Sequence, residues 1–371
     1  MVSGTASGLG WPGVSVAVSR ERPSGLGWPT APHERSAAPA PPGPAAPDTR
    51  GPAERTTPVT QTPLNPGDSP LVREALSSVV SRETSAPAQT KTSARAVGDS
   101  REARDGDWPR PPKCRIIAVA NQKGGVGKTT TSVNLAAALS MHGLRVLVID
   151  LDPQGNASTA LAIEHRGDIP DVYQVLVEDR PMAEIIKEVP DMPGLWCAPA
   201  TIDLAGAEIE LVSLVARESR LARAINALDT ISFDYIIIDC PPSLGLLTVN
   251  ALVAADELLI PIQCEYYALE GLGQLLRNVD LVKAHLSPRL NLSTILLTMF
   301  DGRTRLASQV AEEVRSHFKD TVISTVIPRS VRVSEAPSYG QSVITYDPGS
   351  SGAMAYVDAA RELAHRAAPA V

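Results

Sequence analysis

A glycine-rich loop between an apolar run and a helical pattern restricts the fold of this 371-residue chain more than any other feature. The loop reads Lys123-Gly-Gly-Val-Gly-Lys-Thr-Thr130. It follows the apolar run Ile116–Ala120 and leads into a helical pattern over Lys128–Met141. A strand, a glycine-rich loop and a helix in this order direct backbone N–H groups and the positive end of the helix at one point. The sequence therefore predicts a phosphate-binding loop at the carboxyl end of a buried strand.

The rest of the chain after Cys114 alternates short apolar runs with helical patterns. This alternation predicts an α/β fold with a mostly parallel central sheet and helices on both of its faces. We expect strands at Ile116–Ala120, Val146–Ile149, Leu195–Ala198, Tyr235–Ile238, Leu258–Ile262, Leu292–Leu297 and Val322–Val326. We expect helices at Lys128–Met141, Ser213–Leu228, Gly245–Ala254, Glu270–His285, Leu306–Phe318 and Gly352–His365.

The chemistry of the loop suits a nucleoside triphosphate with its magnesium ion. Lys128 would provide a positive charge for the β- and γ-phosphates, and the Thr129 hydroxyl would ligate Mg²⁺. The ordinary phosphate-loop pattern begins with glycine, but Gln122 stands at that position and a second lysine, Lys123, follows it. The predicted cofactors are ATP and Mg²⁺. The predicted nucleotide contacts come from Lys123, Gly124, Gly125, Val126, Gly127, Lys128, Thr129 and Thr130.

Three carboxylates stand at or just beyond the ends of apolar strands. Asp150 and Asp152 alternate along an extended chain, so they point to the same side of it, and Asp239 ends the run that begins at Tyr235. Near a γ-phosphate, such groups can hold Mg²⁺ with its waters and orient an attacking water. Acids after a strand also occur in ordinary solvated turns. The phosphate loop favours the site, so we assign Asp150, Asp239 and Thr129 to the metal.

The first 113 residues differ in composition from the rest. They contain 18 of the 32 prolines, mixed with Ala, Gly, Ser, Thr and Arg. Such a stretch has too few bulky apolar residues to offset its ordering entropy. We therefore predict a disordered tail at 1–113, one folded domain at 114–366 and a short tail at 367–371.

Composition also argues against several classes of protein. No stretch approaches the length of a membrane span, which predicts a cytoplasmic protein. The four cysteines are widely spaced, so we expect buried free thiols rather than disulfides or a zinc site. The net charge is -7, so any DNA binding has to use a local basic patch.

The segment Lys123–Thr129 (KGGVGKT) resembles the deviant Walker A motif of the ParA/MinD/nitrogenase-iron-protein superfamily of P-loop NTPases. Further blocks resemble the ParA/Soj branch of chromosome-partitioning ATPases. They are Asn121–Thr131, Asp152–Asn156, Leu204–Leu211, Asp239–Leu247, Gln263–Leu272 and Ile327–Pro337. The similarity runs through nearly all of residues 114–364.

The resemblance implies roles for individual residues. Lys123 is similar to the lysine that reaches across an ATP-sandwich homodimer to the partner's nucleotide, and Asp152 to the acid needed for hydrolysis. Lys123, Lys128 and Asp152 are therefore the predicted catalytic residues of a slow, partner-stimulated ATPase. Pro328 and Ser330 would border the adenine. Many relatives carry Asn in place of Ser330.

The resemblance also implies macromolecular partners. The ATP dimer would bind non-specific DNA through arginines late in the domain, and a centromere-binding partner of the ParB/Spo0J type would stimulate hydrolysis. Phosphate contacts require only cations on a shared face, although surface arginines are more often solvated or ion-paired. The candidates are Arg303, Arg305, Arg329 and Arg332, with Arg315 and Lys319 as weaker ones. The expected location is the nucleoid.

Two alternative functions share the loop. A membrane-positioning ATPase similar to MinD would need a basic C-terminal amphipathic helix, whereas Met354–His365 carries mainly small apolar residues and few cations. An electron-transfer iron protein would need paired cysteines near a dimer axis. Cys240 and Cys264 both follow apolar strands, but packing is the simpler role for them.

Overall fold

The computed structural model describes residues 108–228, 233–265 and 268–366. Nearly all of the predicted tail at 1–113, and the predicted tail at 367–371, lie outside the described residues. Trp108 begins the described part, where its ring stacks on His142 with the ring centroids 4.0 Å apart. No helix in this part of the chain is long and apolar enough to cross a membrane.

A single sheet runs through the described residues, and its strands lie in the order β3-β4-β2-β5-β1-β6-β7-β8. Every pairing in it is parallel except that of β3 with β4. The mostly parallel sheet confirms the predicted fold class. The strands are β1 (Arg115–Val119), β2 (Val146–Asp150), β3 (Lys187–Glu188), β4 (Leu195–Ala198), β5 (Tyr235–Asp239), β6 (Glu257–Gln263), β7 (Asn291–Phe300) and β8 (Val322–Pro328).

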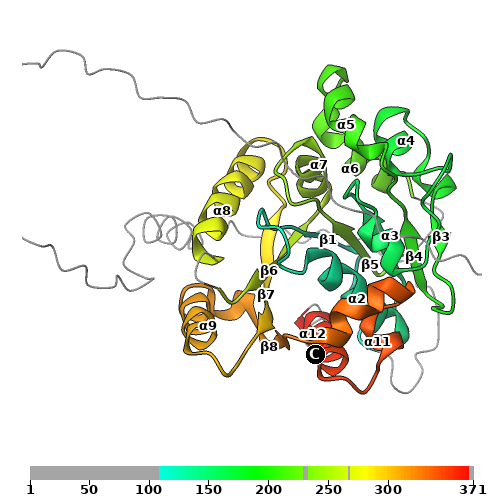
Figure 1. Ribbon diagram of the computed structural model, residues 1–371. Coiled ribbons are helices and arrows are strands. Elements are labelled where there is room, and N and C mark those ends of the chain that lie inside the picture. The colour runs from blue at the N-terminus through cyan, green and yellow to red at the C-terminus, as the bar shows by residue number, and fades with distance from the viewer. Residues whose placement is uncertain (1–107, 229–232, 266–267, 367–371) are drawn as a thin grey trace, which may run out of the picture. The chain divides into compact units, whose positions relative to one another are not determined.

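Helices cover both faces of this sheet, as Figure 1 shows. One face packs against α2 (Lys128–Met141), α3 (Asn156–Ala160), α11 (Val343–Tyr346) and α12 (Ser351–Arg366). The other packs against α4 (Val172–Val177), α5 (Leu204–Glu210), α6 (Arg220–Asn226), α7 (Leu246–Ala254), α8 (Ala268–His285) and α9 (Arg305–Phe318). The short helix α10 (Val331–Glu335) follows β8.

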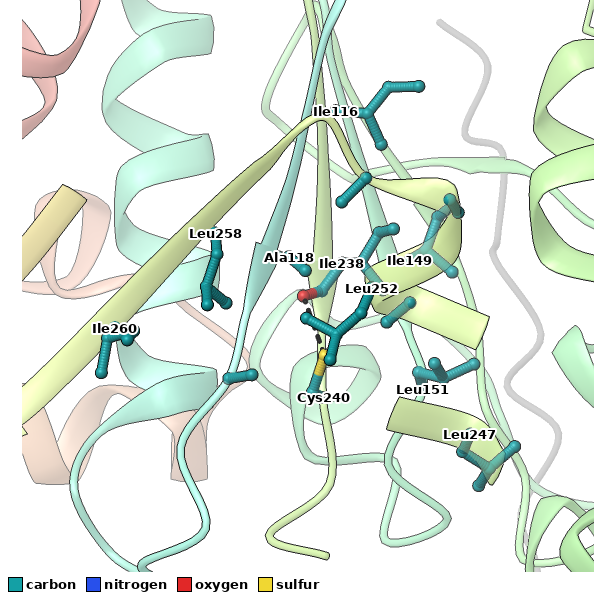
Figure 2. Packing of buried hydrophobic residues seen from close by; sticks show 14 of the residues in the cluster. Ile116, Ala118, Ile149, Leu151, Ile238, Cys240, Leu247, Leu252, Leu258 and Ile260 are labelled. Atoms are coloured by element: carbon teal, nitrogen blue, oxygen red, sulfur yellow. Dashed lines mark hydrogen bonds between the residues drawn. The ribbon is translucent and has the colours of Figure 1, made fainter. Parts of the chain in front are cut away.

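Alternate residues of each central strand enter different apolar clusters. In β5, Tyr235 and Ile237 lie on the α2 side, whereas Ile236 and Ile238 lie on the α7 side. Figure 2 shows Ile238 among Ala118 of β1 and Leu252 of α7. Full burial of each such Ile or Leu contributes about 1.5–3 kcal/mol. Burial on both faces is why these strands are almost continuously apolar in sequence.

The register of the central strands brings their carboxyl ends together. Asp239 is paired with Val119 of β1 on one side and with Asp150 of β2 on the other. After β1 the chain passes through α2 to β2, which lies beyond β5. After β5 it passes through α7 to β6, which lies on the opposite side of β1. Ligands of open α/β sheets bind at such a divergence.

One predicted helix is partly wrong. Ser213–Leu228 was expected to be continuous, but Leu214 is extended and Ala216 has a left-handed φ of 52°, so α6 starts only at Arg220. By contrast, α2 has the predicted bounds, and all seven predicted strands are present. Cys197, Cys240 and Cys264 are buried free thiols, as expected, and Cys114 is half-buried.

Candidate functional site

The glycine-rich loop is held by hydrogen bonds to two neighbouring strands of the sheet, β6 and β7. The Asn121 side chain donates to the Pro261 carbonyl of β6 at 2.8 Å, and its oxygen accepts from the Lys123 N–H at 3.0 Å. The Thr298 hydroxyl of β7 donates to the Val126 carbonyl at 2.8 Å. These bonds fix the loop between the end of β1 and the start of α2.

Glycine is required in the loop by backbone geometry and leaves room for a ligand. Gly125 and Gly127 have φ values of 74° and 89°, a region that other residues enter only with strain. A Cβ added at Gly124 or Gly125 would meet no heavy atom within 4 Å. The backbone is thus exposed beside the first turn of α2, whose N–H groups lack helical partners. This cradle fits phosphate oxygens.

Lys128 points into the protein. It is only 7% exposed, and its ammonium donates to the Lys123 carbonyl at 3.4 Å. Burial lowers the pKa of Lys128, while the nearby Asp239 and Asp152 carboxylates raise it. The loop lysine therefore lies with two of the three predicted carboxylates.

The two carboxylate oxygens of Asp239 differ in their hydrogen bonding. Its Oδ1 accepts from the Ser132 hydroxyl at 3.0 Å, but its buried Oδ2 has no hydrogen-bond partner among the described residues. Burial and the neighbouring Asp150 raise the pKa of Asp239, and the Thr129 and Ser132 hydroxyls act in the opposite direction. A buried, unpaired carboxylate oxygen beside a threonine hydroxyl fits the oxygen-ligand preference of Mg²⁺.

Asp150 differs from Asp239 because both of its oxygens are already engaged. Its Oδ2 accepts from the Ser158 N–H at 2.8 Å and the Ser158 hydroxyl at 2.7 Å, and its Oδ1 accepts from the Asp152 N–H at 3.2 Å. Burial raises the pKa of Asp150, and the Ser158 bonds partly offset this. Asp150 thus holds the turn that carries Asp152, which is 7% exposed.

Lys123 points away from this cluster. Its ammonium forms an ion pair with Glu265 at 3.0 Å, and the Lys123 side chain is 34% exposed. The other Glu265 oxygen lies 3.8 Å from the guanidinium of Arg329. We assigned no role to Glu265 from sequence. It lies within the Gln263–Leu272 block, but no spacing connects it to a lysine 142 positions earlier.

The predicted adenine residues lie at the same edge of the sheet. Pro328 ends β8 opposite Phe300 of β7, the strand whose Thr298 contacts the loop. Ser330 precedes α10 and lies near Gly352 of α12, where an added Cβ would be 3.3 Å from the Ser330 hydroxyl oxygen.

The four predicted DNA-contacting arginines follow the carboxyl ends of β7 and β8. Three of them already have carboxylate partners: Arg303 with Asp301 at 2.8 Å, Arg329 with Glu265, and Arg332 with Glu335 at 3.0 Å and Asp347 at 3.3 Å. Arg305, exposed in the first turn of α9, forms no ion pair with a described residue. Its charge is therefore the one among these four arginines that no described carboxylate pairs with.

Comparisons with known proteins give consistent matches. A family model described as an AAA domain matches residues 114–292. The sporulation initiation inhibitor protein Soj of Bacillus subtilis is 58% identical over 250 residues, which cover 67% of this chain and 98% of that protein. The chromosome partitioning protein ParA of Myxococcus xanthus is 53% identical over 255 residues, covering 69% and 89%.

A solved structure with bound ligands is also similar. Cobyrinic acid a,c-diamide synthase from Mycobacterium smegmatis, crystallised with an ATP analogue and magnesium, is 40% identical with a TM-score of 0.58. The match covers 67% of this chain and 93% of that one.

Proposed function

Because the chain belongs to the ParA/Soj family of chromosome-partitioning ATPases, we propose that it is an ATP-dependent switch that dimerises, binds non-specific DNA as the ATP dimer, and segregates chromosome or plasmid DNA with a ParB-type partner. The observation that carries this proposal is that the two loop lysines have different surroundings. Lys128 is buried with Asp152 and Asp239, whereas Lys123 is half-buried and paired with Glu265. One subunit thus presents a lysine that its own carboxylate cluster does not use.

Within one subunit, the loop would hold ATP by its phosphates. Backbone N–H groups from Gly124 to Thr130 and the Lys128 ammonium would contact the phosphate oxygens, and Pro328 and Ser330 would border the adenine. Mg²⁺, when bound, would neutralise charge on the β- and γ-phosphates. Thr129 and Asp239 would hold it, with Asp150 next to them in the register of the sheet.

Hydrolysis would depend on Asp152, which would orient the attacking water. A switch that must persist turns over slowly, so stimulation by the partner would set its lifetime. Asp152→Ala should keep ATP binding and trap the DNA-bound dimer. Simultaneous loss of ATP and DNA binding in this variant would contradict the role of Asp152.

DNA contact would use Arg303, Arg305, Arg329 and Arg332 after the ends of β7 and β8. Three of these have to exchange a carboxylate partner for phosphate, whereas Arg305 does not. The predicted location is therefore the nucleoid within the cytoplasm.

The packing of α12 favours this function over a MinD-like positioning ATPase. Its Ala353, Tyr356, Ala359 and Leu363 are buried in the apolar cluster that contains α2. A membrane-binding helix would leave its apolar face available.

The direct test measures ATP turnover with and without non-specific DNA and the ParB-type protein of the same organism, together with ATP-dependent DNA retention. Wild type should be stimulated and retained, and Lys128→Ala should show neither response. Absence of both responses in wild type would overturn the proposed function.

A further inference from the structure

Glu265 is the carboxylate that the second loop lysine uses within its own subunit. It follows β6, the neighbour of β1, and its Oε2 lies 3.0 Å from the Lys123 ammonium. Both side chains are half-buried, with 34% of Lys123 and 47% of Glu265 exposed. The proposed function requires Lys123 in a second subunit, yet the lysine is already paired inside the first. This ion pair has to break before Lys123 can reach another nucleotide.

The backbone of Lys123 is held at both of its polar groups. Its N–H donates to the Asn121 side chain at 3.0 Å, and its carbonyl accepts from the Lys128 ammonium at 3.4 Å. Its own ammonium, in contrast, forms an ion pair with Glu265 alone among the described residues. Rotation about the side-chain bonds can therefore move the Lys123 charge while the phosphate loop keeps its shape.

Glu265 has other partners that keep it in place when the lysine leaves. The Gln263 amide donates to Glu265 Oε1, and the Arg329 guanidinium lies 3.8 Å from the same oxygen. The Glu265 N–H also donates to the Gln263 carbonyl at 2.8 Å. Lys123 thus shares a partly exposed carboxylate with a second cation, and such a pair is weak. A triphosphate offers the ammonium several anionic oxygens and charge-assisted hydrogen bonds, so it can displace Glu265.

We propose that Glu265 is a positioning residue that keeps Lys123 within its own subunit, so that the triphosphate bound to a second copy has to displace it before the ATP dimer closes. This inference rests on the proposed function, because it requires dimerisation through the nucleotide. The ion pair favours the monomer, and each dimer breaks two such pairs. Glu265 therefore sets how tightly the ATP dimer holds together.

Sedimentation velocity over a protein concentration series, with Mg²⁺ and a non-hydrolysable ATP analogue, measures the dissociation constant of the dimer. Loss of one exposed ion pair changes an equilibrium by up to about fivefold, so Glu265→Gln should lower this constant by about 2- to 25-fold. The matched control is Glu184→Gln. It makes the same chemical change at a glutamate that is 55% exposed and pairs with Arg180 at 3.2 Å. It should leave the dissociation constant unchanged.

A second measurement separates the release of Lys123 from the loss of a negative charge near a dimer interface. Brief treatment of the nucleotide-free protein with acetic anhydride acylates lysines that are not held by a carboxylate, and mass spectrometry reports the labelling of each one. Glu265→Gln should raise the labelling of Lys123 by about two- to fivefold. Lys113, whose side chain is 76% exposed, is the internal reference and should be labelled equally in both proteins.

Two results would overturn the inference. A dissociation constant of Glu265→Gln equal to or above that of wild type would show that Glu265 does not restrain the dimer. A tighter dimer with unchanged labelling of Lys123 would show that the carboxylate acts by repulsion and not through the lysine. If wild type itself stays monomeric with the ATP analogue, the proposed function fails instead, so the two failures are distinguishable.

Discussion

At the scale of single residues, neighbouring strands end in two carboxylates that differ in their remaining bonding capacity. Ser158 and the Asp152 N–H use both oxygens of Asp150, whereas Asp239 keeps one buried oxygen without a partner among the described residues. A buried polar atom without a partner destabilises the fold unless a ligand satisfies it. Asp239 is thus the carboxylate best suited to a metal ion, at a cost to stability that its replacement should reveal.

Asp239→Asn should stabilise the nucleotide-free protein at pH 8 and weaken Mg²⁺ binding. Burial and Asp150 raise the Asp239 pKa above its unfolded value, so the unfolded chain ionises first as pH rises. As pH rises from the unfolded pKa of Asp239 to its folded pKa, the free energy of unfolding of wild type therefore falls. Asn does not ionise, so the variant lacks this loss. The variant's free energy of unfolding should exceed that of wild type by on the order of 1 kcal/mol at pH 8.

Urea denaturation at pH 5 and pH 8 measures this effect. The difference in free energy of unfolding between variant and wild type should be smaller at pH 5, where Asp239 is closer to protonated in both the folded and the unfolded state. Asp203→Asn, which removes an exposed carboxylate from the turn before α5, is the control. A gap that stays constant or widens at pH 5 would refute the assignment.

At the scale of secondary-structure elements, local pattern determined what sequence could predict. Continuous apolar runs revealed all seven longer strands, and the glycine-rich loop and helical pattern set the bounds of α2. The five-residue helices α3 and α10 and the two-residue strand β3 are too short to show a period. The break before α6 depends on the left-handed backbone at Ala216. Alanine favours a helix, so the residue type at this position does not predict the break.

Sequence likewise predicted one part of the candidate site and not the other. The loop and the three strand-end carboxylates follow from motif and topology, and the resemblance to ParA/Soj sequences is confirmed by the relatives. The ion pair of Lys123 with Glu265 and the contact of Glu208 with Gly245 join residues far apart in sequence. Only the folded chain brings such pairs together, so no spacing rule could find them.

Gly245→Ala should lower the free energy of unfolding by about 1 kcal/mol or less, because the new methyl displaces the Glu208 carboxylate, the far end of a flexible side chain. Adding Glu208→Ala to the same chain should restore most of that loss. Thermal or urea unfolding of the two single variants and the double variant measures the coupling. Gly124→Ala, whose Cβ would meet nothing within 4 Å, is the control. Additive losses in the double variant would contradict the contact.

At the scale of the whole molecule, nucleotide and DNA would act at the same edge of the sheet. The phosphate loop follows β1, and the candidate arginines follow β7 and β8. Lys123 and Arg329 share Glu265, which connects the loop to one of these arginines. A change of partner at Lys123 would therefore alter the surroundings of Arg329.

Arg305→Ala should weaken retention on non-specific DNA by the ATP-bound protein and reduce the dependence of log affinity on log salt by about one. Arg305 forms no ion pair within the described part of the chain, so its loss removes a cation without freeing a carboxylate. Binding titrations at several NaCl concentrations measure both quantities. Arg361→Ala, on α12, removes an exposed arginine that pairs with Asp358 and should leave retention unchanged. Equal effects of the two substitutions would argue against the placement of the DNA surface.

Sedimentation velocity with Mg²⁺ and ATP tests most directly whether the two loop lysines act in different subunits. The account predicts that wild type sediments as a dimer only with ATP. Lys123→Ala should bind ATP but remain a monomer, because the lysine that contacts the partner's nucleotide is gone. Lys128→Ala should fail to bind ATP. A Lys123→Ala protein that dimerises with ATP as wild type does would contradict the central claim.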